Sequence, residues 1–148
     1  MEATVRTVQT ATEAETEEVG RALAAEVGAR GLILLHGDLG AGKTAFVRGL
    51  SAGVGADPDE VSSPTFTVMQ EYRGAATVLR HVDLYRLSPG FDVDELGLDD
   101  FAAEGLVAVE WAERYDSAAP RGAWVVRIAI DDDTHRTITI ARTSGVRC

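Results

Sequence analysis

The sequence is poor in several residue types, and each scarcity excludes a class of protein. Its one cysteine, Cys148, has no partner for an intramolecular disulfide. No apolar run approaches the ~20 residues of a membrane-spanning helix, and the first residues lack the apolar core of a signal peptide. We therefore expect a cytoplasmic protein without membrane attachment, whose residues 1–148 form one domain.

Positive charge is also scarce. The chain has 14 lysine and arginine residues against 24 aspartate and glutamate residues, which gives a formal charge of −10, and it has no basic cluster. Proteins that grip DNA or RNA directly need basic side chains to neutralise phosphates. We therefore expect any contact with tRNA or DNA to be indirect, because an acidic surface suits a protein partner better.

Asparagine is absent, and histidine occurs only three times. Switch GTPases as a class read guanine with an Asn-Lys-x-Asp loop, which a chain without asparagine cannot contain. His36, His81 and His135 lack a second histidine or a cysteine at metal-binding spacing, so we do not expect a zinc site.

The single lysine lies in the most informative segment of the chain. Lys43 belongs to the octapeptide Gly-Asp-Leu-Gly-Ala-Gly-Lys-Thr at residues 37–44, a complete G-x-x-x-x-G-K-T phosphate loop. All 13 other permanently cationic side chains are arginines. An ammonium is compact enough to fit between phosphate oxygens, whereas a guanidinium is a planar fork. The sequence therefore predicts a nucleotide site at this loop.

The flanks of the loop have the character that a phosphate loop requires. Residues 32–36 form a short unbroken apolar run, typical of a buried strand, and residues 44–52 are predicted to form the helix that the loop opens. An earlier helix is predicted over 12–27, with apolar residues spaced by four. Thr12 or Thr16 is the expected cap of that helix, and Thr12 with Glu15 resembles a capping box.

The rest of the chain predicts more strands than helices. Two strands at 66–72 and 76–83 are joined by a turn at 73–74, and residues 92–104 are expected to form short helices interrupted at Gly97. An apolar strand at 106–109 ends in Glu110, and residues 123–130 and 134–141 form a final hairpin. We expect an α/β fold, a single P-loop NTPase-like domain with a mixed central sheet flanked by helices.

The predicted loop would hold the phosphates of ATP through successive backbone N–H groups, with help from the positive end of the helix. Gly40 and Gly42 allow a close backbone approach. Lys43 would bridge the β- and γ-phosphates, and the Thr44 hydroxyl would bind Mg²⁺. The expected phosphate-binding residues are Leu39, Gly40, Ala41, Gly42, Lys43 and Thr44.

Two strand-end carboxylates are candidates for the remaining roles. Glu110 ends an unbroken apolar run, as a central strand beside the loop strand should, whereas Arg80 and His81 interrupt the run that ends at Asp83, which is typical of a partly exposed strand. We assign Glu110 to Mg²⁺ and Asp83 to the attacking water or the γ-phosphate. The alternative for Asp83 is a structural carboxylate that accepts backbone N–H bonds.

Residues 62–67 form a hydroxyl-rich turn, Ser-Ser-Pro-Thr-Phe-Thr. Such a segment can order itself around a γ-phosphate and relax after hydrolysis. Ordinary turns have the same composition, so both interpretations stay open.

In combination, these motifs resemble the bacterial TsaE family, the ATPases of tRNA threonylcarbamoyladenosine biosynthesis. The resemblance covers nearly the whole chain. It rests on the loop at 37–44, Ser-Ser-Pro-Thr-Phe at 62–66, His-x-Asp-Leu-Tyr-Arg at 81–86, Glu-Leu-Gly at 95–97 and Val-Glu-Trp at 109–111. It implies Mg²⁺-dependent ATP hydrolysis that drives modification of adenosine 37 in tRNAs reading ANN codons, with TsaB and the catalytic TsaD as partners.

The resemblance also implies roles for individual residues. Thr44 and Glu110 match the Mg²⁺ ligands. Asp83, together with Lys43, matches the residues needed for hydrolysis, and Trp111 lies next to the site. Adenine contacts in the family come from the start of the first helix and from the C-terminal hairpin. Here they would be Thr12 or Glu13, and Arg136.

Two other functions can be weighed against an ATPase of this family. A small-molecule kinase would need an arginine-bearing helical lid, and no segment after Glu110 is long and basic enough to form one. A regulatory or scaffold protein that binds ATP without significant turnover has no such requirement, and it stays open as the alternative.

Overall fold

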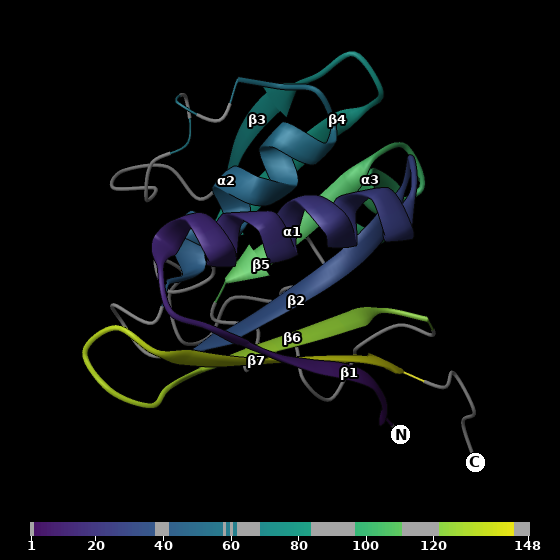
Figure 1. Ribbon diagram of the computed structural model, residues 1–148. Coiled ribbons are helices and arrows are strands. Elements are labelled where there is room, and N and C mark those ends of the chain that lie inside the picture. The colour runs from purple at the N-terminus through teal and green to yellow at the C-terminus, as the bar shows by residue number, and fades with distance from the viewer. Residues whose placement is uncertain are drawn as a thin grey trace.

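The computed structural model describes residues 2–37, 42–57, 59, 61, 69–83, 97–110 and 122–143. Within those ranges, seven strands and three helices are arranged as in Figure 1. In chain order they are β1 (Glu2–Thr10), α1 (Glu13–Val27), β2 (Gly31–Gly37), α2 (Lys43–Gly53), β3 (Met69–Arg73), β4 (Val78–Asp83), α3 (Leu98–Ala102), β5 (Leu106–Glu110), β6 (Trp124–Ile130) and β7 (Arg136–Thr143).

The strands form one mixed sheet in the order β1-β7-β6-β2-β5-β4-β3. The inner strands β6, β2, β5 and β4 run parallel, and the outer strands pair antiparallel with their neighbours. The predicted α/β fold with a mixed sheet flanked by helices is confirmed. The carboxyl ends of β2, β5 and β4 lie side by side, and such an edge is where open α/β sheets bind ligands.

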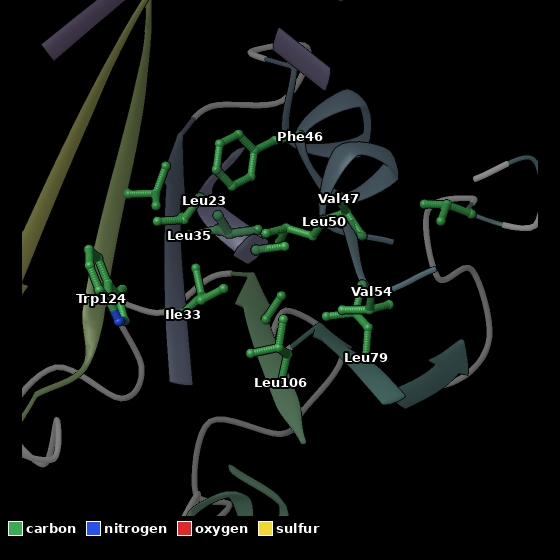
Figure 2. Close-up of a cluster of buried hydrophobic side chains, with 14 of the residues drawn as sticks. Leu23, Ile33, Leu35, Phe46, Val47, Leu50, Val54, Leu79, Leu106 and Trp124 are labelled. Atoms are coloured by element: carbon green, nitrogen blue, oxygen red, sulfur yellow. The ribbon is translucent and has the colours of Figure 1, made fainter. Parts of the chain in front are cut away.

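Apolar side chains pack against both faces of the sheet. On one face, α1 and α2 cover the larger cluster, whose members include Leu23, Ile33, Leu35, Phe46, Leu50, Leu79 and Leu106 (Figure 2). On the other face, a smaller cluster contains Leu34, Val107 and Val109, with Phe101 of α3 packed against it. Because β2 and β5 contribute to both clusters, their apolar runs correctly predicted strands that are buried on both sides.

The start of α1 is fixed by local hydrogen bonds. The Thr12 side chain accepts a bond from the backbone nitrogen of Glu15 at 3.1 Å, and Glu15 accepts one from the backbone nitrogen of Ala11 at 2.6 Å. Thr12 is therefore the N-cap, as one of the two expectations had it. Thr16 is instead a buried residue inside the helix, where its hydroxyl lies 2.9 Å from that of Thr10.

Two expectations about strands need correction. The strand β1 was not predicted at all, although it pairs with β7 along its length. The strand β4 was expected to be partly exposed, yet every residue from Leu79 to Asp83 is buried. The other predicted elements are present, apart from the parts at 66–68 and 92–96, which lie outside the described residues. No helix among the described residues is long and apolar enough to cross a membrane.

Glycines allow α1 and α2 to pack in direct backbone contact. A Cβ atom at Gly49 of α2 would lie 1.9 Å from the carbonyl oxygen of Glu17, and one at Gly20 of α1 would lie 2.3 Å from the carbonyl oxygen of Phe46. Because these neighbours are backbone atoms, no side-chain rotation can relieve the clash. This contact therefore sets the position of α2 relative to α1.

We expect Gly49→Ala to destabilise the protein because the two helices must move apart. Overpacking of this kind costs about 1–3 kcal/mol, which corresponds to a fall in Tm of about 2–12 °C for a chain of this size. Thermal unfolding measures it. Ser51→Ala in the same helix is the control, since Ser51 is fully buried and its hydroxyl has no hydrogen-bond partner among the described residues. That control should be neutral or stabilising, and a Gly49→Ala protein as stable as the wild type would contradict the packing argument.

Candidate functional site

The phosphate loop connects the carboxyl end of β2 to the first turn of α2. Residues 38–41, which include Leu39, Gly40 and Ala41, lie outside the described residues. Gly42 is the N-cap of α2 and has φ +104° and ψ 17°, a left-handed conformation that a residue with a side chain rarely adopts. A Cβ atom there would have space, since its nearest neighbour would be 3.7 Å away. Backbone conformation, rather than space, therefore favours glycine at this end of the loop.

Lys43 is buried at the first position of α2. Its side chain is 6% exposed, and Nζ lies 3.7 Å from Oε1 of Glu110. The two residues meet because β5 is the direct neighbour of β2, with Leu35 and Glu110 in register. A buried ammonium is costly without a charged or hydrogen-bonding partner, so the Glu110 carboxylate stabilises this lysine inside the fold.

Asp83 and Glu110 end adjacent parallel strands and are register partners. Both are almost fully buried. Side chains that are in register on neighbouring strands share a face of the sheet, and here that face is the one that α2 covers. The sequence correctly predicted that Glu110 ends a central strand beside the loop strand. It did not predict that Asp83 lies next to Glu110 with equal burial.

The Glu110 carboxyl is surrounded by groups that favour its ionised form. Burial alone would raise its pKa, but the hydrogen bond from His81 Nε2 and the positive charge of Lys43 outweigh burial and lower the pKa below its ordinary value. Glu110 is therefore a carboxylate at neutral pH. An ionised carboxylate beside a phosphate loop is suited to binding a cation.

The donors near the loop fit Mg²⁺ by their chemistry. Thr44 follows Lys43 in the first turn of α2 and offers a hydroxyl, and Glu110 offers an ionised carboxylate. Mg²⁺ prefers oxygen ligands and takes only one or two from protein carboxylates, with phosphates and water completing its shell. Among the described residues, no group of three or more histidine, cysteine, aspartate or glutamate side chains could hold a metal ion by itself. The available donors thus suit a cation that a nucleotide helps to bind.

A cavity of about 240 Å³ lies beside the loop, between the start of α1 and the turn of the β6–β7 hairpin. It brings together residues that are far apart in the sequence, including the candidates Thr12, Glu13 and Arg136. Arg136 is anchored there by Nη1, which donates to the carbonyl oxygens of Asp132 at 2.8 Å and His135 at 3.0 Å. The lining residues are Ala11, Thr12, Glu13, Thr16, Gly42, Ala45, Asp133, Thr134 and Arg136.

Some members of the site were missed by sequence reasoning, and others cannot be placed. The link between His81 and Glu110 was missed, because strand periodicity places Leu79, His81 and Asp83 on one face but does not identify a partner on another strand. Asp133 and Thr134 carried no sequence signal beyond that of a turn. Trp111 and the hydroxyl-rich turn at 62–67 lie outside the described residues.

Comparison with known proteins supports the family that the motifs resemble. The model of the family "Threonylcarbamoyl adenosine biosynthesis protein TsaE" matches residues 10–138. The tRNA threonylcarbamoyladenosine biosynthesis protein TsaE of Bacillus subtilis is 38% identical over 128 residues, which are 84% of this chain and 79% of that protein. The protein of the same name from Aquifex aeolicus is 42% identical over 112 residues, 75% of this chain and 77% of the relative.

The fold is also similar to a solved structure. The crystal structure of Bacillus subtilis YdiB matches with a TM-score of 0.74 and 30% sequence identity, over 97% of this chain and 88% of that one. The family match covers the phosphate loop, both strand-end carboxylates and the start of the β6–β7 hairpin. The chain therefore belongs to the TsaE family of threonylcarbamoyl adenosine biosynthesis proteins.

Proposed function

We propose that the protein is a Mg²⁺-dependent ATPase that supports threonylcarbamoyl modification of adenosine 37 in tRNAs reading ANN codons, together with the TsaB–TsaD complex. The observation that carries this proposal is the buried contact of Lys43 with the ionised Glu110, at the sheet edge where the phosphate loop begins. Family membership supports the tRNA pathway, because its characterised relatives are named as threonylcarbamoyladenosine biosynthesis proteins.

Phosphate binding would use the positive end of α2 and Lys43. The N-terminus of α2 offers backbone N–H groups and a partial positive charge, and Lys43 Nζ would move from Glu110 to the phosphate oxygens. Thr44 and Glu110 would hold Mg²⁺, which when bound neutralises charge on the β- and γ-phosphates. Glu110 would thus have a cationic partner both with and without the nucleotide.

Hydrolysis would use Asp83. Its carboxylate lies one strand beyond Glu110 on the same face, which suits a group that orients or deprotonates the attacking water while Glu110 serves the cation. Two buried carboxylates in register repel each other. A cation near the pair would relieve this repulsion, which would favour binding of Mg²⁺ with its nucleotide.

The adenine base would enter the cavity between α1 and the β6–β7 hairpin. We expect Arg136→Ala to weaken ATP binding about 5- to 30-fold, because stacking of a guanidinium on an aromatic ring contributes about 1–2 kcal/mol. Affinity for inorganic triphosphate should not change. Equilibrium binding measures both, with Arg21→Ala on the exposed side of α1 as the matched control. Equal losses for ATP and triphosphate would contradict an adenine-binding role.

The tRNA would be reached through the partner proteins. The formal charge of −10 disfavours direct binding to RNA and favours docking onto a protein. The carbamoyl transfer would belong to TsaD, and the role of this chain would be the hydrolysis that sustains repeated cycles.

A reconstituted assay tests the proposal. Purified protein is combined with TsaB, TsaD and tRNA, and both ATP hydrolysis and modified adenosine are measured. We expect slow hydrolysis by the protein alone, faster hydrolysis with TsaB–TsaD, and a loss of repeated modification when this chain is omitted. Equal turnover of GTP and ATP, or no response to the partners, would contradict the proposal. ATP binding without turnover under all conditions would favour the scaffold alternative.

A further inference from the structure

His81 is a fully buried polar side chain between the apolar cluster and the carboxyl edge of the sheet. It lies on β4, and its neighbours on the same face of the sheet include Leu79, two residues earlier, and Ala108, its register partner on β5. The His81 Nδ1 atom has no hydrogen-bond partner among the described residues. Buried polar atoms are normally paired, and an unpaired one costs about 1–3 kcal/mol. An apolar side chain would avoid this cost, but it would remove the hydrogen bond that His81 makes to Glu110.

Within the described part of the chain, the His81 side chain makes one polar contact, which is with the candidate Mg²⁺ ligand. His81 Nε2 donates to Oε2 of Glu110, while the other carboxylate oxygen, Oε1, lies 3.7 Å from Lys43 Nζ. The two oxygens thus have different partners. Rotation of the carboxylate would break the bond to His81, so the orientation of Oε1 toward the loop is maintained by the histidine.

We propose that His81 is a positioning residue, which holds the Glu110 carboxylate in the orientation that Mg²⁺–nucleotide binding requires. This inference rests on the proposed function. The physical reason is that partners behind a metal ligand fix its geometry, and their removal typically lowers metal affinity or activity about 10- to 100-fold. The cost of the unpaired Nδ1 is offset by the role of the Nε2 hydrogen bond to Glu110. We therefore place the contribution of His81 in ligand positioning rather than in core packing.

His81→Leu and His81→Gln test the proposal as a pair. Leucine is apolar and cannot donate, whereas glutamine places an amide donor at a reach similar to that of Nε2. We expect His81→Leu to raise the Mg²⁺ concentration needed for tight binding of a non-hydrolysable ATP analogue by about 10- to 100-fold. Affinity for the analogue in the presence of a chelator should stay unchanged. His81→Gln should restore most of the Mg²⁺ dependence.

A double substitution separates positioning from a general structural effect. In a Glu110→Gln protein, adding His81→Leu should cause no further loss, because both changes act through one carboxylate. Val82→Ala is the matched control, since Val82 is the next buried residue of β4 but packs on the opposite face. Thermal unfolding verifies that each variant is folded. If His81→Leu does not fold, the Mg²⁺ dependence of analogue binding is measured on His81→Gln.

The outcomes distinguish this inference from the proposed function. A wild-type protein whose nucleotide affinity does not depend on Mg²⁺ would contradict the proposed function and, with it, the role of His81. A Mg²⁺-dependent wild type with an unchanged His81→Leu variant would overturn the inference alone. Equal losses with and without Mg²⁺, or a full additional loss in the Glu110→Gln background, would also overturn it, because a positioning residue acts only through its carboxylate.

Discussion

Replacing Lys43 with alanine is expected to lower the rate of ATP hydrolysis by about 100- to 1,000-fold, which is the usual cost of removing one preorganised donor to a developing charge. The single lysine of the chain is buried where the phosphate loop enters α2, and in the described ranges no other lysine or arginine contacts Glu110. Hydrolysis is measured at saturating Mg²⁺ and ATP, so that a change in affinity does not mask the change in rate.

Lys43→Arg separates charge from shape in this prediction. Arginine keeps the positive charge, but its planar guanidinium is too wide for the position that a compact ammonium occupies between phosphate oxygens. We therefore expect Lys43→Arg to lose nearly as much activity as Lys43→Ala. Hydrolysis by the arginine variant within about tenfold of the wild type would mean that charge alone suffices and that the choice of lysine in an arginine-rich chain is incidental.

Stability should respond differently from activity in these two variants. Lys43→Ala leaves the buried carboxylate of Glu110 without its ammonium, and the pKa of Glu110 then rises because burial is less well compensated. Lys43→Arg retains a cation. The alanine variant should therefore have the lower Tm above the pKa of Glu110, and the difference should shrink at acid pH, where a protonated Glu110 needs no partner.

The parts of the fold with strong local signals were predictable from sequence. β2 and β5 are unbroken apolar runs because both faces of each strand are covered. The phosphate loop requires glycine and lysine at fixed spacing, and Thr12 caps α1 through a contact three residues along the chain. In each case the residues that determine the local structure lie within a few positions of one another, so a single segment of sequence is enough to predict it.

The parts that depend on distant partners were not predictable. β1 has no alternation of apolar and polar residues. It forms a strand because its backbone pairs with that of β7, more than 100 residues later. In β4, Arg80 and His81 looked exposed, but both are buried because their partners come from other elements. Arg80 donates to Glu71 at 2.8 Å and lies 4.5 Å from the centre of the Phe101 ring, and His81 donates to Glu110. Periodicity cannot detect such partners.

The division of roles between Asp83 and Glu110 gives the second large expected effect. Asp83→Asn should lower hydrolysis about 100- to 10,000-fold, the range for loss of a general base, while Mg²⁺–ATP binding stays near the wild-type value. Glu110→Gln should instead weaken Mg²⁺-dependent binding, because an amide cannot offer the charge that the cation requires. Binding of a non-hydrolysable analogue with and without Mg²⁺, measured beside single-turnover hydrolysis, separates the two effects.

The register of β4 and β5 gives Asp83 and Glu110 equivalent positions, so their roles must be separated by experiment. Asp83 and Glu110 end adjacent strands at the same level and with similar burial, so strand position alone does not rank them. Glu110 is bonded to His81 and paired with Lys43, and these two groups keep it ionised for a cation. Loss of Mg²⁺-dependent binding in Asp83→Asn, with binding retained in Glu110→Gln, would show that the two carboxylates have exchanged roles and that His81 and Lys43 prepare a catalytic group instead.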